Sequence, residues 1–502
     1  MPDTLISRFL LRIERFGNRL PHPTLLFIYL CALVLVLSAL MAWFGVNALH
    51  PISGDTITAI NLLSRDGLHA ILEKAVTNFT HFAPVGTVLV AILGIGIAER
   101  SGLLSTVLQA AVLKASPKLL SFIVVLCGIL SSLAADTGYV VLIPLAAIVF
   151  IAAGRHPIIG IAAAFAGVSG GFSANLLIGP IDALLAGIST EAAQFIDSQY
   201  QVSAAGNYYF LLISTLVIAS VGTLVTEKIV APRFECCPFD KDPHEEPNVI
   251  DVCEKRALKI VGLYSVLFIA LLLLALVPEN GWLRGVDGSV LRSPFMGGIV
   301  VIISLYAGLA GIIYGKLSGR FNRDNHFINA MDASMGTMAS YLVLMFFAAQ
   351  FVSYFNWSQL GIISAVKGSE ILQMLQLSNA VLLVCFVFFA ALINLLIGSA
   401  SAKWALMAPI FVPMFMLSGI SPEAAQVAYR IGDSSTNIIT PLMPYFGVVV
   451  AFVQKYDKDA GMGTILAMML PYSMAFLLLW SLLLAGWILL GLPLGPGSAV
   501  LL

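Results

Sequence analysis

Long apolar stretches alternate along the chain with short polar interruptions. Most of these stretches reach the roughly 20 residues that a helix needs to cross the hydrocarbon core of a bilayer. Lys and Arg gather at several of their ends, as they do beside membrane spans. We predict nine transmembrane helices, at residues 25–44, 83–98, 157–187, 207–230, 258–277, 295–315, 328–355, 423–453 and 464–490.

Two other apolar segments are each interrupted near the middle by a polar break, and each half is too short to span. Basic residues flank both ends of the first segment, so both ends are expected on the same side of the membrane. A polar hairpin tip is tolerated at membrane depth where protein or a water-filled cavity surrounds it. We therefore predict two re-entrant hairpins, residues 118–154 with a break at 134–138 and residues 379–420 with a break at 398–403.

The composition agrees with this pattern and narrows the class of protein. Of the 502 residues, 59% are hydrophobic and 11% are charged, whereas soluble proteins carry about 25% charged residues. The net charge of −1 gives no argument for a nucleic-acid partner. The predicted fold class is an all-α polytopic membrane protein in a lipid bilayer, with nine transmembrane helices plus two re-entrant helical hairpins in inverted repeats.

The distribution of Lys and Arg also predicts the orientation. Residues 1–22 mix basic and apolar positions, which predicts a cytoplasmic amphipathic segment before a retained first span. Two membrane halves follow, at 23–230 and 258–502, joined by a charged cytoplasmic loop at 231–257. The N-terminus is then cytoplasmic and the C-terminus periplasmic, in the inner membrane of a bacterial cell.

The two halves share short sequence matches. Residues 139–144 align with 404–409 at an offset of 265, which places aromatic over aromatic and proline over proline. Residues 170–175 align with 432–437 at an offset of 262. Because one hairpin is predicted to enter from inside and the other from outside, the repeats are inverted. Inverted repeats with interrupted helices are typical of secondary transporters with a central site.

We refer to the predicted span at 423–453 as the second broken helix. The charged residues inside it are the first candidates for binding substrate or ion. Arg430 and Asp433 are three residues apart, so they share a helical face and could pair. A charge at membrane depth costs a few kcal/mol, so it persists mainly where pairing or function offsets that cost. If the segment from Gly432 to Pro441 unwinds, Asp433, Asn437 and freed carbonyls form a site for a hard cation. The alternative is a salt bridge at the end of a span.

The first broken helix, the predicted span at 157–187, offers fewer charged groups. It centres on Ser173 and Asn175, and Asn175 is a further candidate ion ligand. Asp182 follows in the same segment, and two interpretations remain open for it. It is either a solvated loop carboxylate or a buried one that carries protons, since burial raises the pKa of a carboxyl group.

The second hairpin carries the remaining candidates. Ser401 lies at its tip, where a hydroxyl can bind substrate or ion. Trp404 could stack on a flat ligand or belong to an interfacial belt. Asn394 lies in an apolar arm and needs a partner, either a cation or a carbonyl at the tip. Pro422 follows the hairpin and could simply begin the next helix.

The cysteines and the remaining polar residues exclude other classes. The six cysteines form no disulfide framework. Cys236, Cys237 and Cys253 share the charged loop, where no histidine at ligand spacing completes a metal site. No catalytic set of His, Asp and Ser stands out, so a membrane-embedded transferase is a remote alternative. The protein is not expected to be an enzyme or to hold a cofactor other than a coupling ion.

Seven sequence blocks spread along the chain form a series: PHP at 21–23, FAP at 82–84, GRHP at 154–157, DALLAGISTE at 182–191, APIFVPMFM at 408–416, RIGDSS at 430–435 and LPLGPG at 492–497. In this order they resemble the AbgT family, the p-aminobenzoyl-glutamate transporters. The resemblance implies a homodimer whose subunits have nine spans and two hairpins. It also implies transport of p-aminobenzoyl-glutamate-like folate fragments and, in some members, export of sulfonamides.

The resemblance assigns roles to residues already singled out. It implies an ion site at Asn394 and Asp433, where Na⁺ is one option and H⁺ the other. One stretch, residues 436–441, is more polar than in the importing branch and resembles the drug-exporting branch, so export is favoured. A sodium-coupled dicarboxylate or anion carrier remains the alternative function. The residues implied to line the substrate path are Asp182, Ser401, Trp404, Pro422, Arg430, Asp433 and Pro441.

Overall fold

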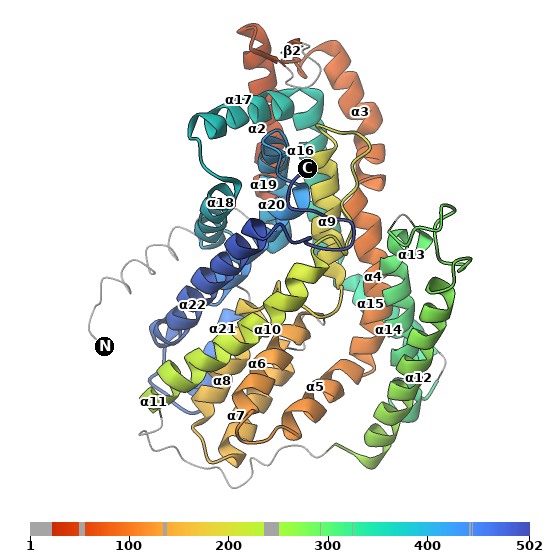
Figure 1. Ribbon diagram of the computed structural model, residues 1–502, viewed down its shortest axis with the longest axis vertical. Helices are drawn as coiled ribbons and strands as arrows, with labels where there is room; N and C mark the ends of the chain where they lie inside the picture. The colour runs from red at the N-terminus through yellow and green to blue at the C-terminus, as the bar shows by residue number, and fades with distance from the viewer. Residues whose placement is uncertain are drawn as a thin grey trace.

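Nearly all of the regular secondary structure in the part of the chain that the computed structural model describes is helical (Figure 1). The described residues are 23–49, 56–133, 138–234, 250–291, 293–323, 325–440, 443 and 445–502. The predicted amphipathic segment, the tip of the first hairpin with Asp136 and Thr137, Cys236, Cys237 and Pro441 lie outside them.

The first half contains α2 (Pro23–Trp43), β1 (Asn47–Leu49), β2 (Thr56–Thr58), α3 (Arg65–Thr80), α4 (Ala83–Arg100), α5 (Leu103–Leu113), α6 (Leu120–Leu130), the 3₁₀ turn η1 (Ser131–Leu133), the π-helix η2 (Gly138–Leu142), α7 (Ile143–Ala152), α8 (Pro157–Phe165), the π-helix η3 (Ala166–Gly170), α9 (Pro180–Ala193), α10 (Tyr208–Val225), the π-helix η4 (Thr226–Val230) and α11 (Ala231–Phe234).

The second half contains α12 (Val252–Leu276), α13 (Pro294–Gly297), α14 (Ile299–Leu317), α15 (Asn325–Gly336), α16 (Ala339–Trp357), α17 (Leu360–Met374), α18 (Asn379–Asn394), α19 (Ala400–Met416), α20 (Pro422–Asn437), α21 (Phe446–Gln454) and α22 (Met462–Leu489).

Seven stretches of described helix are long and apolar enough to cross a membrane. They correspond to seven of the nine predicted spans, and the all-α polytopic fold is confirmed. The other two predicted spans, 157–187 and 423–453, are each broken into shorter helices. An eighth span would count α17 and α18 together, which are bent by 119° at a short break. The total of nine stays a prediction.

Three segments differ from the prediction. The stretch between the first two spans, expected to be a loop, contains the antiparallel pair β1–β2 and the 16-residue helix α3. The span predicted at 328–355 is divided into α15 and α16. Helix α17 was not predicted at all. Both α3 and α17 carry polar and charged residues between their apolar ones, so a search for continuous apolar runs passes over them.

The first helix break is where the sequence predicts it, and the second is displaced. Helix η3 ends at Gly170 and α9 begins at Pro180, so Ser173 and Asn175 lie in the break. Helix α20, however, remains regular through Asn437. The hydroxyl of Thr436 donates to the Gly432 carbonyl at 2.8 Å. The hydroxyls of Ser435 and Thr436 therefore bond within the helix instead of lining an unwound segment.

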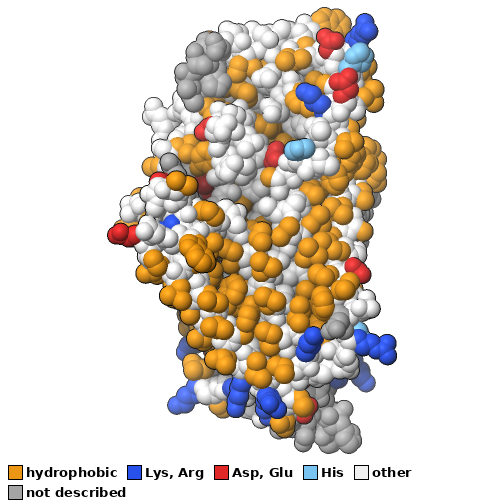
Figure 2. Space-filling view, turned by 90° about the vertical axis from the view of Figure 1, so that its right-hand side faces the viewer, with side chains coloured by type: hydrophobic (Ala, Val, Ile, Leu, Met, Phe, Trp, Pro, Cys, Tyr) orange, Lys and Arg blue, Asp and Glu red, His pale blue; other side chains and the backbone are white. Residues whose placement is uncertain are grey.

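One face of the molecule has the surface expected next to lipid. Figure 2 shows a band of apolar side chains, with Lys and Arg gathered below it and more acidic and His side chains above. Large apolar residues of α12 and α14 are exposed, among them Leu263, Leu267, Leu274 and Leu305. In water an exposed apolar surface of this extent would promote aggregation, and in a bilayer it is solvated by lipid.

Helix α20 packs closely against α18, and Gly432 permits the approach. A Cβ atom at Gly432 would lie 2.4 Å from the Val387 carbonyl oxygen and 2.7 Å from the Ala391 nitrogen. We expect Gly432→Ala to destabilise the protein by about 1–3 kcal/mol, because the clash is with backbone atoms. Thermal unfolding of the detergent-purified protein measures the effect.

The matched control is Gly486→Ala in α22, where a Cβ atom meets nothing within 4 Å. In an open helical position Ala is favoured over Gly by about 0.5–1 kcal/mol, so this variant should be at least as stable as the parent. Equal melting temperatures for the two variants would show that the α18–α20 contact does not depend on the glycine.

Candidate functional site

A stripe of polar side chains runs along the buried α20. Glu423, Gln426, Arg430, Asp433 and Asn437 follow one another at spacings of three and four residues, so they share one helical face. Every residue of α20 is buried. Polar groups are stable inside a protein when they are paired, so the neighbours of this stripe define the site.

Two ion pairs form where other helices meet the stripe. Arg430 Nη1 lies 2.6 Å from Asp182 Oδ1, and both side chains are 2% exposed. Lys403 Nζ pairs with Asp433 Oδ1, and these side chains are also buried. The prediction that Arg430 pairs with Asp433 is therefore wrong. Spacing along α20 allowed that pair, but each side chain instead meets an opposite charge on another helix.

The break in the first half holds the Asp182–Arg430 pair in place. Asp182 is in the first turn of α9, where its Oδ2 accepts the Gly179 N–H at 2.7 Å. Arg430 also donates to the Ser173 carbonyl at 3.1 Å. Of the two interpretations of Asp182, the solvated loop carboxylate is wrong, because its side chain is buried and paired.

Two donors at this pair lack a hydrogen-bond partner among the described residues. They are Arg430 Nε and Ser173 Oγ, and both atoms are buried. Buried donors are nearly always satisfied by protein or by ordered water. Two unsatisfied donors on adjoining residues therefore mark a place where an acceptor group of a ligand could bind.

Asn394 joins the second ion pair to α20. Its Nδ2 faces three acceptors: the Asp433 carbonyl at 2.6 Å, Thr436 Oγ1 at 2.8 Å and Asn437 Oδ1 at 2.9 Å. Its Oδ1 accepts a hydrogen bond from Lys403 Nζ. A side-chain amide has only two N–H protons, so this cluster holds more oxygen acceptors than the amide can satisfy. The structure brings Asn394, Asp433 and Asn437 together, as predicted.

Asn175 occupies the matching place in the first half. Its Nδ2 donates to Ser132 Oγ at 3.2 Å. Ser132 and Asn394, like Asn175 and Asn437, are 262 positions apart. The end of the first arm of each hairpin thus bonds to the broken helix of its own half at matching positions, with donor and acceptor exchanged, which supports the internal repeat. Because Asn175 bonds to Ser132 in the first half, it does not join Asn394, Asp433 and Asn437, the other predicted ion ligands.

Trp404 is fully buried, so the interpretation as an interfacial belt residue is wrong. Its ring stacks on Tyr429 with centroids 4.6 Å apart and an interplanar angle of 26°. Its Nε1 donates to Ser189 Oγ at 3.0 Å, and Ser189 donates to Gln426 at 2.7 Å. Tyr139, which aligns with Trp404 in the repeat, stacks instead on Tyr445 of the second half, with centroids 4.3 Å apart.

The remaining candidates are one residue at the tip of the second hairpin and two prolines beyond it. Ser401 is partly buried in the first turn of α19, and its hydroxyl is 3.2 Å from that of Ser399. Pro422 is the first residue of α20 and follows the capping residue Ser421. Its fixed φ angle and missing N–H suit that position, so a helix-starting role accounts for it. Pro441 lies outside the described residues.

Several residues of the site were not predicted. Lys403 enters the prediction only as the last residue of the hairpin break at 398–403, and Tyr429, Gln426 and Ser189 do not enter it as site residues. The spacing of polar residues in α20 would have identified Gln426. No comparable sequence signal exists for Ser189, which lies on a different helix from its partners.

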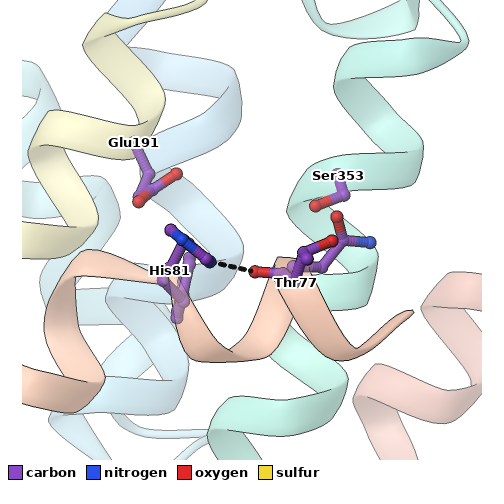
Figure 3. A pocket seen from close by; sticks show the side chains of 6 residues that line it. Thr77, His81, Glu191 and Ser353 are labelled. Atoms are coloured by element: carbon purple, nitrogen blue, oxygen red, sulfur yellow. Dashed lines mark hydrogen bonds between the residues drawn. The ribbon is translucent and has the colours of Figure 1, made fainter. Parts of the chain in front are cut away.

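A separate cavity of about 390 Å³ lies between α3, α9 and α16, and its lining includes Thr77, His81, Glu191 and Ser353. Figure 3 shows the side chains of His81 and Glu191 pointing towards one another across it. His81 Nδ1 is 3.2 Å from the Thr77 carbonyl oxygen, and Glu191 accepts the Ala83 N–H at 3.0 Å. Glu191 is nine residues beyond Asp182 on α9, a rise of roughly 13 Å, so the cavity is distinct from the ion pairs.

Within the described part of the chain, no three His, Cys, Asp or Glu side chains gather as metal ligands. Cys253 is exposed on α12. Its two predicted partners, Cys236 and Cys237, are outside the described residues, so the proposed thiol metal site is not tested.

Membrane-crossing helices, two broken helices related by a repeat and a buried charged centre between them define a multi-pass membrane transporter, not an enzyme. The family model described as AbgT putative transporter family matches residues 8–502. The chain belongs to the AbgT family, and the resemblance inferred from the sequence is confirmed.

Relatives of known name cover almost the whole chain. The p-aminobenzoyl-glutamate transport protein of Escherichia coli (strain K12) is 40% identical over 97% of this chain and 95% of its own. The crystal structure of the Alcanivorax borkumensis YdaH transporter, described as having an unusual topology, is 54% identical. It has a TM-score of 0.92 over 95% of this chain and 100% of that one. Neisseria gonorrhoeae MtrF, described as illuminating a class of antimetabolite efflux pumps, is 49% identical. Its TM-score is 0.93 over 98% of this chain and 100% of that one.

Proposed function

We propose that this protein is an ion-coupled secondary transporter of p-aminobenzoyl-glutamate-like folate fragments and that it exports sulfonamides. The observation that carries the proposal is the buried Arg430, whose Nε has no hydrogen-bond partner among the described residues. A carboxylate is the ligand group that a guanidinium binds best. The neighbouring Trp404–Tyr429 stack offers the aromatic surface that an aminobenzoyl ring needs.

The relatives support the choice of substrate and direction. One is named for p-aminobenzoyl-glutamate transport, and a more similar one is described among antimetabolite efflux pumps. Sulfonamide drugs carry the same aminophenyl group as p-aminobenzoate, so one aromatic surface can serve both. The polar stretch that follows Asp433 supports export.

The coupling ion is Na⁺ or H⁺, held by Asn394, Asp433 and Asn437. All three supply oxygen atoms, which hard cations prefer. Asn175 would serve the first half in the same way. Asp182, Ser401, Trp404, Arg430 and Asp433 would line the substrate path, together with the two helix-boundary prolines.

We also propose an assembly and orientation. The protein is a homodimer in the bacterial inner membrane, with a cytoplasmic N-terminus and a periplasmic C-terminus. The basic end of the face in Figure 2 supports this orientation, since Lys and Arg collect on the cytoplasmic side. Cross-linking in native membranes and accessibility of terminal tags test these two points.

The test of function is flux in proteoliposomes with sodium and pH gradients imposed separately. We expect saturable movement of p-aminobenzoyl-glutamate and of a sulfonamide that depends on one of the two gradients. Absence of gradient-dependent flux for both compounds would exclude the proposed substrates.

A sodium-coupled dicarboxylate carrier is the second candidate. The presence of two buried cations, Lys403 and Arg430, in one site favours it. Competition distinguishes the two functions: succinate, and not aminobenzoyl compounds, should inhibit flux through a dicarboxylate carrier.

A further inference from the structure

Lys403 contacts the same two side-chain groups that are proposed to hold the coupling ion. Its Nζ donates to Asn394 Oδ1 and pairs with Asp433 Oδ1, and its side chain is completely buried. An ammonium group bound by a carboxylate and an amide oxygen has the surroundings of a small cation. The two cannot share these oxygens at once.

The position of Lys403 in its helix is unfavourable unless those contacts exist. It lies in the first turn of α19, which begins at Ala400 after the capping residue Ser399. The N-terminus of a helix carries partial positive charge and favours anions. A buried lysine there is therefore stabilised by Asp433 and Asn394, and it becomes free to move when another cation neutralises Asp433.

We propose that the Lys403 ammonium is a tethered substitute for the coupling cation, and that a bound cation displaces it so that it binds a second carboxylate of the substrate. The proposal rests on the proposed function of Asn394 and Asp433 as ion ligands. It adds Lys403 to the binding residues and gives it two alternating partners.

The surroundings of Asn394 are suited to such an exchange. When Lys403 leaves, the Asn394 oxygen loses its donor, and the amide can turn that oxygen towards the cation. The Asp433 carbonyl, Thr436 Oγ1 and Asn437 Oδ1 are already within 2.9 Å of the Asn394 side chain. The hydroxyl of Tyr429 donates to the Ala400 carbonyl at 2.6 Å and lies 3.5 Å from Asp433 Oδ1, so it fixes the tip of the hairpin beside the carboxylate.

The released ammonium would act beside Arg430. Asp433, the present partner of Lys403, is three residues from Arg430 on α20, a rise of about 4.5 Å. Two cations one turn apart match the two carboxylates of a glutamyl group. Cation binding and dicarboxylate binding then strengthen one another, since each stabilises the state in which Lys403 has left Asp433.

This exchange distinguishes two kinds of ligand. A dicarboxylate uses Lys403 and Arg430, so its binding is linked to the cation. A ligand with one anionic group needs only Arg430 and leaves the Lys403–Asp433 pair intact. The substrate class therefore determines whether a cation binds together with it.

Equilibrium binding to the purified protein tests the proposal at fixed pH, in sodium chloride and in choline chloride. The ligands are p-aminobenzoyl-glutamate, p-aminobenzoate and succinate. For the wild-type protein we expect sodium to raise the affinity for p-aminobenzoyl-glutamate by about 5- to 150-fold, the usual range of coupling between sites. The affinity for p-aminobenzoate should change less than about twofold.

Two variants separate the outcomes. In Lys403→Met the affinity ratio of p-aminobenzoyl-glutamate to p-aminobenzoate should fall towards one. Lys403→Met/Asp433→Asn removes both charges, so it avoids an unpaired buried carboxylate, and it should lose both this ratio and the sodium effect. Sodium acting equally on both aromatic ligands, or an unchanged ratio in both variants, would overturn the proposal.

Failure of the proposed function gives a different result. If neither aromatic ligand binds the wild-type protein, the proposed substrates are wrong. The role of Lys403 is then decided by succinate, whose sodium-dependent binding supports it when both variants abolish that dependence. Succinate binding that is independent of sodium, or no succinate binding, would overturn it.

Discussion

Replacing Arg430 by methionine should abolish transport and also destabilise the protein by about 3–5 kcal/mol. The destabilisation arises because Asp182 would remain as an unpaired charge in a site that is 2% exposed. Transport should be lost because the substrate carboxylate has no guanidinium to bind. Flux in proteoliposomes and thermal unfolding in detergent measure the two effects separately.

The control for stability is the double variant Arg430→Met/Asp182→Leu. Replacing both members of a buried ion pair by apolar residues of similar volume is often neutral or stabilising. The double variant should therefore recover most of the melting temperature and remain inactive. Recovery of transport together with stability would show that Arg430 supports only the fold.

Replacing Trp404 by leucine should weaken binding of aromatic substrates by up to about tenfold. The loss corresponds to the roughly 0.5–1.5 kcal/mol that an aromatic pair contributes beyond its buried area. In the structure Tyr429 covers the indole, so a ligand ring must replace this contact. Equilibrium binding of p-aminobenzoate measures the change.

Trp480 provides a matched control on α22. It too is fully buried, and its Nε1 donates to a serine on a neighbouring helix, Ser214, at 2.8 Å. Trp480→Leu should lower stability about as much as Trp404→Leu, because both lose a buried ring and one hydrogen bond. Its affinity for aromatic ligands should be unchanged. A similar loss of affinity in both variants would assign Trp404 to the fold alone.

The features that follow from apolar length were predictable from the sequence. Seven spans, both pairs of hairpin arms and the break at Ser173–Asn175 appear where the hydropathy pattern places them. Helices α3 and α17 were missed, since polar and charged residues interrupt their apolar runs. The second break was misplaced because the hydroxyl of Thr436, taken as a sign of unwinding, bonds back to its own helix.

The site was predictable as a set of residues and not as a set of pairs. Arg430 and Asp433 in α20, and Asn394 and Trp404 on the neighbouring helices, are all buried in one region. Their partners lie on other helices, and one sequence does not reveal which charges meet in space. Arg430 and Asp433 were therefore paired with each other by spacing, although Asp182 and Lys403 are nearer.

The polar stripe of α20 also bears on how the chain enters the membrane. Arg430 and Asp433 would each cost about 2.5–3.5 kcal/mol in an isolated helix at the bilayer centre. Helix α20 is not among the helices apolar enough to cross on their own. The insertion machinery therefore has to retain this segment until α9, α18 and α19 surround it. Biogenesis of the protein should therefore depend on α20 assembling together with α18 and α19 against the much earlier helix α9.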